Sequence, residues 1–175
     1  MHENWAYEKE WLDTFAVHYQ TGEKMPLELV KKIQAAQNFQ AAYMMERQLS
    51  FGMLDMAYHH NGLPENADLR TFEMEAIAPT DLFEPVEGNL QSTSFSHIFS
   101  GGYDAGYYSY KWAEVLDADA FAVFQKKGIF DRETADSFRK NILEKGGSEH
   151  PMKLYKAFRG QEPTSEALLR RNGMI

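Results

Sequence analysis

Apolar side chains recur at intervals of three and four residues along most of this sequence, and this spacing restricts its fold more than any other feature. In the first such stretch, from Trp5 to Tyr19, it places Trp11, Leu12 and Phe15 on one side of a helix. No stretch shows a convincing alternation of apolar and polar residues, which would indicate a half-buried strand. The sequence therefore predicts an all-α fold, a single domain of about seven helices.

Turn and capping residues divide the periodic stretches into separate helices. Thr21-Gly22 should end the first helix, and a break near Gln37-Asn38 should divide the next stretch, which is too long for one ordinary helix. Asp68 and Asp131 carry the short polar side chain that caps a helix N-terminus. The expected helices cover residues 5–19, 27–36, 39–60, 69–77, 103–127 and 132–145, a short stretch from 151, and 164–172.

The helix expected over 39–60 carries an apolar band, the kind of stripe that a helix turns towards a core. Its members are Ala42, Met45, Leu49, Met53 and Met56.

Residues 79–102 form one long Ser/Gly-rich stretch that we expect to be a loop; it also contains Pro79 and Pro85. A loop of this length is uncommon inside a compact domain and is often functional. It leads through His97 into a tyrosine-rich segment. If that segment is helical from Gly102 onward, three tyrosines lie along one face, namely Tyr103, Tyr107 and Tyr110.

Three tyrosines on one helical stripe have two interpretations. Their rings suit the packing of a core, which is the more common reason for an aromatic stripe. Their hydroxyls need hydrogen-bond partners and therefore also suit the wall of a cleft. His97 and the Gly101-Gly102 pair favour the second interpretation, because glycine takes backbone angles closed to other residues and lets a ligand approach closely.

Composition limits the classes of partner. The chain has 175 residues, 43% of them hydrophobic, which is enough for a domain with its own core. A formal net charge of −8 disfavours nucleic acid as a partner, since phosphate binding needs a basic face. No run approaches the roughly 18 apolar residues of a membrane span, and residues 1–5 lack a signal-peptide pattern. We expect a cytoplasmic protein with no membrane partner. Without cysteines, the chain has no disulfides or thiolate metal ligands, and this absence favours no compartment.

The run from His97 to Leu116 closely resembles the substrate loop and following helix of the thimet oligopeptidase family of zinc peptidases. The resemblance continues in Glu3-Asn4-Trp5, in His18–Glu23 and in Gly146–Glu149, and it covers nearly the whole chain. It implies that residues 1–175 are the C-terminal, substrate-binding portion of a larger helical catalytic domain. The family includes oligopeptidases and dipeptidyl carboxypeptidases, so the implied substrates are short peptides, and the choice between the two activities stays open.

The resemblance also assigns roles to individual residues. It implies that Tyr110 is the phenol that donates a hydrogen bond to the oxyanion, and that His97 is a second polar contact to the same intermediate. Tyr103 and Tyr107 are implied as ligands of the substrate. We also expect Gly101 and Gly102 to bind substrate, because a flexible Ser100-Gly101-Gly102 hinge would let the loop close over bound peptide.

The zinc motif of such peptidases, His-Glu-x-x-His, is absent from this chain. His2-Glu3 begins the pattern, but Ala6 stands at the second histidine, and the adjacent His59 and His60 would diverge by about 100° on a helix. By the resemblance, the zinc ligands lie upstream. We therefore expect zinc in the full-length enzyme, held by an N-terminal lobe that is missing here, and neither a metal site nor peptidase activity in this chain alone.

A second hypothesis comes from another functional class. The chain could be a non-enzymatic all-α module that uses the tyrosine face to bind peptides or a partner protein. The coding sequence upstream of Met1 separates the two hypotheses, because an in-frame His-Glu-x-x-His indicates a peptidase and a stop codon indicates the module.

Overall fold

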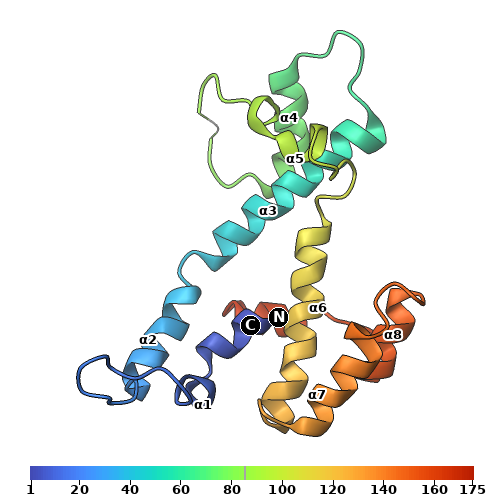
Figure 1. Cartoon of the computed structure of the whole chain (residues 1–175). Helices are drawn as coiled ribbons and strands as arrows, with labels where there is room; N and C mark the ends of the chain where they lie inside the picture. The colour runs from blue at the N-terminus through green and yellow to red at the C-terminus, as the bar shows by residue number, and fades with distance from the viewer. Residues whose placement is uncertain (85) are drawn as a thin grey trace. The chain divides into compact units, whose positions relative to one another are not determined.

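The computed structural model describes residues 1–84 and 86–175, and every named element in that part of the chain is a helix or a helical turn (Figure 1). Nine α-helices lie in the described residues, together with short 3-10 and π turns. The all-α class expected from the apolar spacing is confirmed. The residue contacts form two compact units: unit 1 comprises Met1–Phe39 and Glu114–Ile175, and unit 2 comprises Gln40–Ala113.

Unit 1 has an aromatic core. Phe121 and Phe124 are buried, and the ring of Trp5 packs edge-on against both at centroid distances of 4.6 and 5.0 Å. Trp5 also donates its indole N–H to the carbonyl oxygen of Ile129 at 3.0 Å. The elements of unit 1 are η1 (His2–Tyr7), α1 (Lys9–Leu12), α2 (Leu27–Gln37), the part of α6 (Ser109–Lys127) from Glu114 onward, α7 (Arg132–Phe138), η5 (Arg139–Leu143), α8 (Pro151–Arg159) and α9 (Glu166–Arg171).

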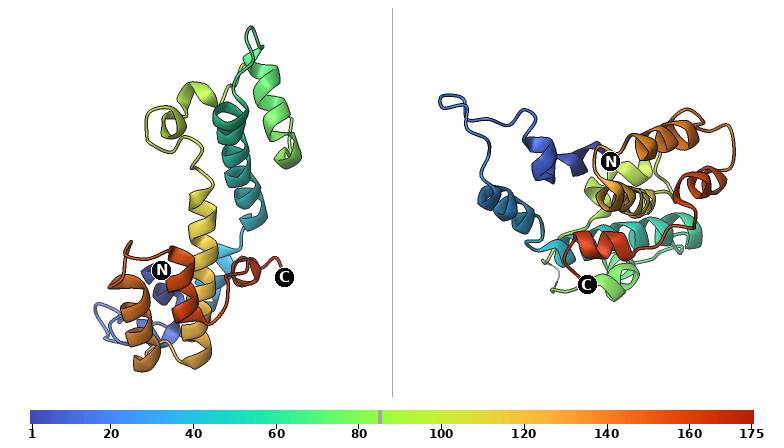
Figure 2. Two further views of the ribbon diagram at one scale, coloured as in Figure 1. Left: turned by 90° about the vertical axis from the view of Figure 1, so that its right-hand side faces the viewer. Right: turned by 90° about the horizontal axis from the view of Figure 1, so that it is seen from below.

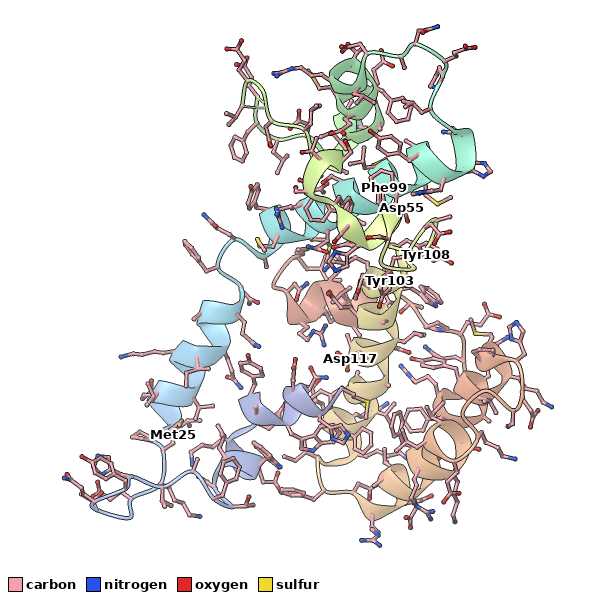
Figure 3. All side chains as sticks on the ribbon, turned by 45° about the horizontal axis from the view of Figure 1, so that its top comes forward. Met25, Asp55, Phe99, Tyr103, Tyr108 and Asp117 are labelled. Atoms are coloured by element: carbon pink, nitrogen blue, oxygen red, sulfur yellow. The ribbon has the colours of Figure 1, made fainter. Side chains whose placement is uncertain are left out.

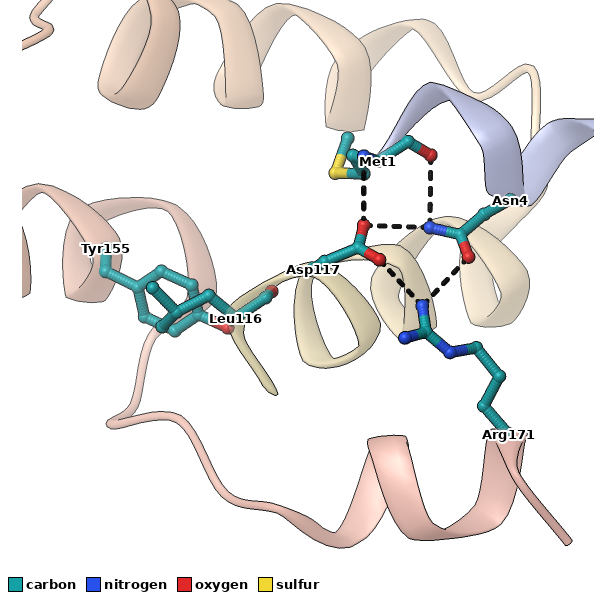
Figure 4. Close-up of polar contacts among 6 residues, drawn as sticks. All are labelled: Met1, Asn4, Leu116, Asp117, Tyr155 and Arg171. Atoms are coloured by element: carbon teal, nitrogen blue, oxygen red, sulfur yellow. Dashed lines mark hydrogen bonds and ion pairs between the residues drawn. The ribbon is translucent and has the colours of Figure 1, made fainter. Parts of the chain in front are cut away.

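Two aspartates of α6 tie segments of unit 1 together. Asp117 accepts a hydrogen bond from the amide of Asn4 at 2.8 Å and one from the guanidinium of Arg171 at 2.7 Å (Figure 4). Asp119 is buried and accepts from the hydroxyl of Tyr155 at 2.6 Å and from Nε of Arg159 at 3.0 Å. Burial and the bond to Asp119 raise the pKa of Tyr155, so this hydroxyl stays a donor at neutral pH.

Unit 2 is organised around α3 (Ala41–Met56), which continues into the π turn η2 (Ala57–Asn61). The next helix, α4 (Leu69–Ile77), lies beside α3 (Figure 2). The core of the unit consists of Phe51, Leu54, Phe95, Ile98 and Tyr107. The remaining elements are η3 (Ala78–Thr80), η4 (Ser92–Ser94), α5 (Ser96–Phe99) and the first residues of α6.

Most of the capping and breaking signals are confirmed. Asp68 and Asp131 accept hydrogen bonds from the backbone N–H three residues on, at 2.9 and 2.8 Å. Helix α2 ends at Gln37, and Gln40 then takes the left-handed backbone angle φ of 55°. The helices expected over 27–36, 69–77, from 151 and over 164–172 correspond to α2, α4, α8 and α9.

The helix expected over 5–19 is wrong beyond residue 12. Its residues form η1 and α1, and Leu12 is the last helical residue. The hydroxyl of Thr14 donates to the carbonyl oxygen of Trp11 at 2.7 Å and competes with a continuing helix. The Nδ1 atom of His18 accepts from the backbone N–H of Thr21 at 3.2 Å and fixes the next turn.

Most of the face of α3 that we expected to lie in the core is exposed. Leu49, Met53 and Met56 are exposed and Met45 is half-buried, whereas Phe51 and Leu54 are buried. Helical periodicity places apolar residues on common stripes, but α3 has two such stripes. Only the packing of distant residues decides which of them is covered.

The loop expected over 79–102 is wrong in its second half, which contains η4 and α5. Phe95 and Ile98 are three residues apart and both are buried in the core of unit 2. A helix of four residues is too short for its period to stand out in the sequence. Pro85, which we assigned to the loop, lies outside the described residues.

Candidate functional site

The tyrosine-rich segment of unit 2 begins with a turn rather than a helix. Helix α6 starts at Ser109, so the expectation of helical residues from Gly102 onward is wrong. The backbone N–H of Gly106 donates to the carbonyl oxygen of Tyr103 at 2.9 Å, and Ala105 takes a φ of 53°. Tyr103 and Tyr107 therefore lie in a tight turn that precedes α6, and Ala105 within this turn has a left-handed backbone conformation.

This turn nevertheless brings the four aromatic side chains singled out from the sequence into contact. The rings of Tyr103 and Tyr110 stack with centroids 5.0 Å apart, and the ring of Tyr107 lies 5.1 Å from that of Tyr110. The imidazole of His97, on α5, lies 6.1 Å from Tyr103 and 6.0 Å from Tyr107. We call these four residues the tyrosine–histidine cluster.

The members of the cluster differ in exposure. Tyr110 is 38% exposed, His97 is also exposed, and Tyr103 is half-buried. Tyr107 is only 8% exposed and donates its hydroxyl to the side-chain oxygen of Gln48 at 3.0 Å. The cluster therefore presents Tyr110, Tyr103 and His97 outward, while Tyr107 packs beneath them.

The hydroxyls of Tyr107 and Tyr110 stay protonated at neutral pH. A hydrogen bond with the side chain of Tyr103 raises the pKa of Tyr110, and partial burial adds to the effect. Burial raises the pKa of Tyr107. A neutral phenol can donate a hydrogen bond to an oxygen that gains negative charge.

The paired glycines before the cluster have different roles. A Cβ atom at Gly101 would lie 2.8 Å from both the Cα and the carbonyl oxygen of His97. Gly102 has open space around it but takes a φ of 78°, which favours glycine. The first glycine allows the backbone to pass close to His97, and the second turns the chain towards Tyr103.

We expect Gly101→Ala to lower the free energy of unfolding by about 1–3 kcal/mol, because the added methyl group overlaps backbone atoms that cannot move independently. Gly147→Ala is the matched control: no neighbouring atom lies within 4 Å of an added Cβ, and its backbone needs no positive φ. Chemical unfolding measures both variants. Equal stability of Gly101→Ala and Gly147→Ala would show that the close approach at His97 is not required.

A residue that the sequence analysis missed holds the turn in place. The carboxylate of Asp55, on α3, is fully buried and accepts hydrogen bonds from the backbone N–H groups of Ala105 at 2.9 Å and Tyr107 at 2.8 Å. Figure 3 shows Asp55 close to Tyr103. The signal available in the sequence was one acidic residue inside the otherwise apolar stretch from Phe51 to Ala57.

A second buried carboxylate fastens the segment that precedes α5. Glu73, on α4, accepts from the backbone N–H groups of Gln91 at 2.8 Å and Ser92 at 3.1 Å, and from the hydroxyl of Tyr58 at 3.1 Å. The ring of Tyr58 packs edge-on against Phe99, with centroids 5.2 Å apart. The stretch that carries His97 is thus held by α4 at its start and by η2 at its end.

The donor set of a catalytic zinc is not found in this chain. The sequence has no His-Glu-x-x-His, and in residues 1–84 and 86–175 no group of three histidine or acidic side chains could hold a metal ion. His59, one of the two adjacent histidines, places its Nδ1 atom 2.8 Å from Oδ1 of Asp55. That the chain binds no zinc stays a prediction.

In the described part of the chain, no helix combines the length and apolar character needed to cross a bilayer.

Comparisons with known proteins match almost the entire chain. The family model described as Peptidase family M3 matches residues 1–174. Oligopeptidase A of Escherichia coli (strain K12) is 48% identical over 178 residues, covering 98% of this chain and 25% of the relative. Probable cytosolic oligopeptidase A of Arabidopsis thaliana is 44% identical over 178 residues, covering 99% and 25%. Dipeptidyl carboxypeptidase of Escherichia coli (strain K12) is 36% identical over 178 residues, covering 99% and 26%. The chain thus spans about a quarter of the length of these curated relatives.

Proposed function

Because the chain belongs to peptidase family M3, we propose that it is the C-terminal, substrate-binding portion of a zinc-dependent oligopeptidase or dipeptidyl carboxypeptidase. The observation that carries this proposal is the tyrosine–histidine cluster, in which the exposed side chains of Tyr110 and His97 both contact the buried ring of Tyr107. The substrates are short peptides. The remainder of the same polypeptide is the partner that completes the site.

Tyr110 acts on the scissile peptide bond. As water adds to the carbonyl carbon, the carbonyl oxygen gains negative charge, and the hydroxyl of Tyr110 donates a hydrogen bond to it. Such a donor, fixed in place before the reaction, stabilises the transition state more than the bound substrate. The raised pKa of Tyr110 keeps this proton on the phenol at neutral pH.

The other members of the cluster bind and orient the peptide. His97 is a second polar contact to the same oxygen, and Tyr103 is a ligand of the substrate, placed by its stacking on Tyr110. Tyr107 was assigned the same role as Tyr103, and its hydroxyl is occupied by Gln48 in this structure. A contact of Tyr107 with substrate therefore requires that this bond be exchanged when peptide binds. Gly101-Gly102 is the hinge at which the loop closes over the peptide.

The zinc of the full-length enzyme, which activates the attacking water, is held by residues outside this chain. We place this enzyme in the cytoplasm, which agrees with the name of the cytosolic relative from Arabidopsis thaliana. The proposed peptidase function is tested by measuring the hydrolysis of internally quenched peptides by the full-length protein before and after treatment with a zinc chelator. The proposal expects hydrolysis that the chelator abolishes and added zinc restores. Full-length protein that cuts no peptide in the presence of zinc would contradict it.

The second candidate function is a non-enzymatic module that binds peptides or proteins. A groove of about 370 Å³ in unit 2 supports it, since the exposed apolar side chains of α3 form one wall of this groove. The residues that line the groove include Leu49, Gly52, Met53, Met56 and Tyr108. The coding sequence upstream of residue 1 decides between the two functions: an in-frame His-Glu-x-x-His supports the peptidase, and a stop codon supports the module.

A further inference from the structure

We propose that Asp55 is a positioning residue of the peptidase site: its buried carboxylate holds the turn from Tyr103 to Tyr107 so that the hydroxyl of Tyr110 meets the substrate in one fixed place. The proposal rests on the proposed function, because it gives Asp55 a part in the same reaction. It names a residue on α3, far in sequence from the cluster, that touches neither substrate nor metal.

All the observed partners of this carboxylate belong to the turn or to its own helix. Oδ1 of Asp55 accepts from the backbone N–H of Ala105 at 2.9 Å and lies 2.8 Å from Nδ1 of His59, and Oδ2 accepts from the backbone N–H of Tyr107 at 2.8 Å. A carboxylate buried at 0% exposure is tolerable only when hydrogen bonds replace its water. Because Asp55 depends on these donors, it fixes the distance between α3 and the turn.

The turn depends on Asp55 in return. Ala105 adopts a φ of 53°, a left-handed conformation that is unfavourable for a residue with a Cβ atom. The bond from its N–H to Asp55 offsets this strain. Tyr107 is bonded to Asp55 through its own N–H, and its carbonyl oxygen accepts from the N–H of Tyr110 at 3.2 Å. A shift of the turn therefore moves Tyr107 and the first turn of α6 together.

The same end of α3 also contacts the segment that carries His97. The imidazole of His59, oriented by Asp55, lies 5.6 Å from the ring of Phe99, two residues after His97 on α5. In Figure 3, Asp55, Phe99 and Tyr103 lie close together in unit 2. Asp55 thus bonds directly to the tyrosine side of the cluster and, through His59, lies next to its histidine side.

Two measurements on the full-length protein test the proposal. The first is hydrogen exchange resolved to single amides, which needs no catalysis. In the unmodified protein, the N–H groups of Ala105 and Tyr107 should exchange slowly although Ala105 is exposed, and Asp55→Asn should accelerate both by about 10-fold or more. Asp119→Asn is the matched control: it removes another buried carboxylate charge, but one bonded to Tyr155 and Arg159 in unit 1, and it should leave the two amides unchanged.

The second measurement is a double-mutant cycle on peptide hydrolysis. A displacement of a reacting group by about 1 Å can cost about 100-fold in rate, so Asp55→Asn should lower kcat by roughly 10- to 100-fold with a smaller change in KM. If Asp55 acts through Tyr110, then Tyr110→Phe should lower kcat much less in the Asp55→Asn background than in the unmodified protein. Loss of stability alone would leave the two effects additive.

The outcomes separate this proposal from the proposed function. Slow exchange at both amides, its loss in Asp55→Asn and a non-additive cycle support the positioning role. Fast exchange at both amides in the unmodified protein overturns it even if Asp55→Asn does not fold, and so does an additive cycle. If the full-length protein hydrolyses no peptide, the proposed function falls, whereas the exchange experiment still decides whether Asp55 holds the turn.

Discussion

Tyr110→Phe in the full-length protein is expected to lower kcat for peptide hydrolysis by about 100-fold while KM changes little. The substitution removes one oxygen atom and leaves the ring, which stacks on Tyr103 and touches Tyr107. Substrate binding should therefore be largely retained. The loss falls on the transition state, where the carbonyl oxygen carries the charge that the hydroxyl stabilises.

Tyr108→Phe is the matched control for this prediction, because it makes the same chemical change two residues earlier, on an exposed side chain outside the cluster. It should keep kcat within about 2-fold, as expected for a surface substitution. The pH dependence is a further check. Because the pKa of Tyr110 is raised, its ionisation should lower kcat only above about pH 10, the ordinary pKa of tyrosine. An unchanged kcat in Tyr110→Phe would remove this residue from the mechanism.

The second large effect concerns the 175-residue chain on its own. We expect it to bind no stoichiometric zinc and to hydrolyse no peptide, in contrast to the zinc-dependent full-length enzyme that we propose. The physical reason is the missing donor set: the sequence lacks His-Glu-x-x-His, and residues 1–84 and 86–175 contain no group of three histidine or acidic side chains that could hold a metal ion. Metal analysis after dialysis and a quenched-peptide assay measure the two properties.

The control for this comparison is the folded state of the separated chain. Its circular dichroism should indicate mainly helix, as in the structure, so that inactivity is not a result of unfolding. One zinc ion per chain together with hydrolysis that a chelator stops would contradict the prediction. It would also require metal ligands that the sequence pattern does not reveal.

The parts of the fold that the sequence predicted are those governed by local chemistry. Asp68 and Asp131 cap their helices because a short acceptor side chain satisfies a backbone N–H three residues away. The division after Gln37 likewise follows from residues next to it. These interactions span a few residues, and the sequence alone contains everything needed to recognise them.

The parts that the sequence could not predict depend on residues far apart in the chain. The turn at Ala105 is held by Asp55, 50 residues earlier, and a continuing helix was the simpler reading of the local pattern. The buried stripe of α3 is the one that contacts Phe95, Ile98 and Tyr107, and no local pattern identifies it.

The tyrosines that we expected on one face do lie together, next to His97, but the structure brings them together by a different route. We derived the row of rings from helical spacing, whereas Tyr103 and Tyr107 lie in a turn before α6. The expectation held for the side chains because a tight turn and a short α5 bring the same residues together. The roles of these residues came from the resemblance to known peptidases and stay predictions.

The central claim is that the exposed side of the tyrosine–histidine cluster faces the peptide bond being cut. A crystal structure of the full-length protein with a phosphinic peptide tests it most directly, because the tetrahedral phosphorus resembles the carbon that water has attacked. We predict the hydroxyl oxygen of Tyr110 within about 3 Å of a phosphinyl oxygen, the distance of a good hydrogen bond. A cluster covered by other protein segments, with no atom of the inhibitor within reach of Tyr110 or His97, would contradict the claim.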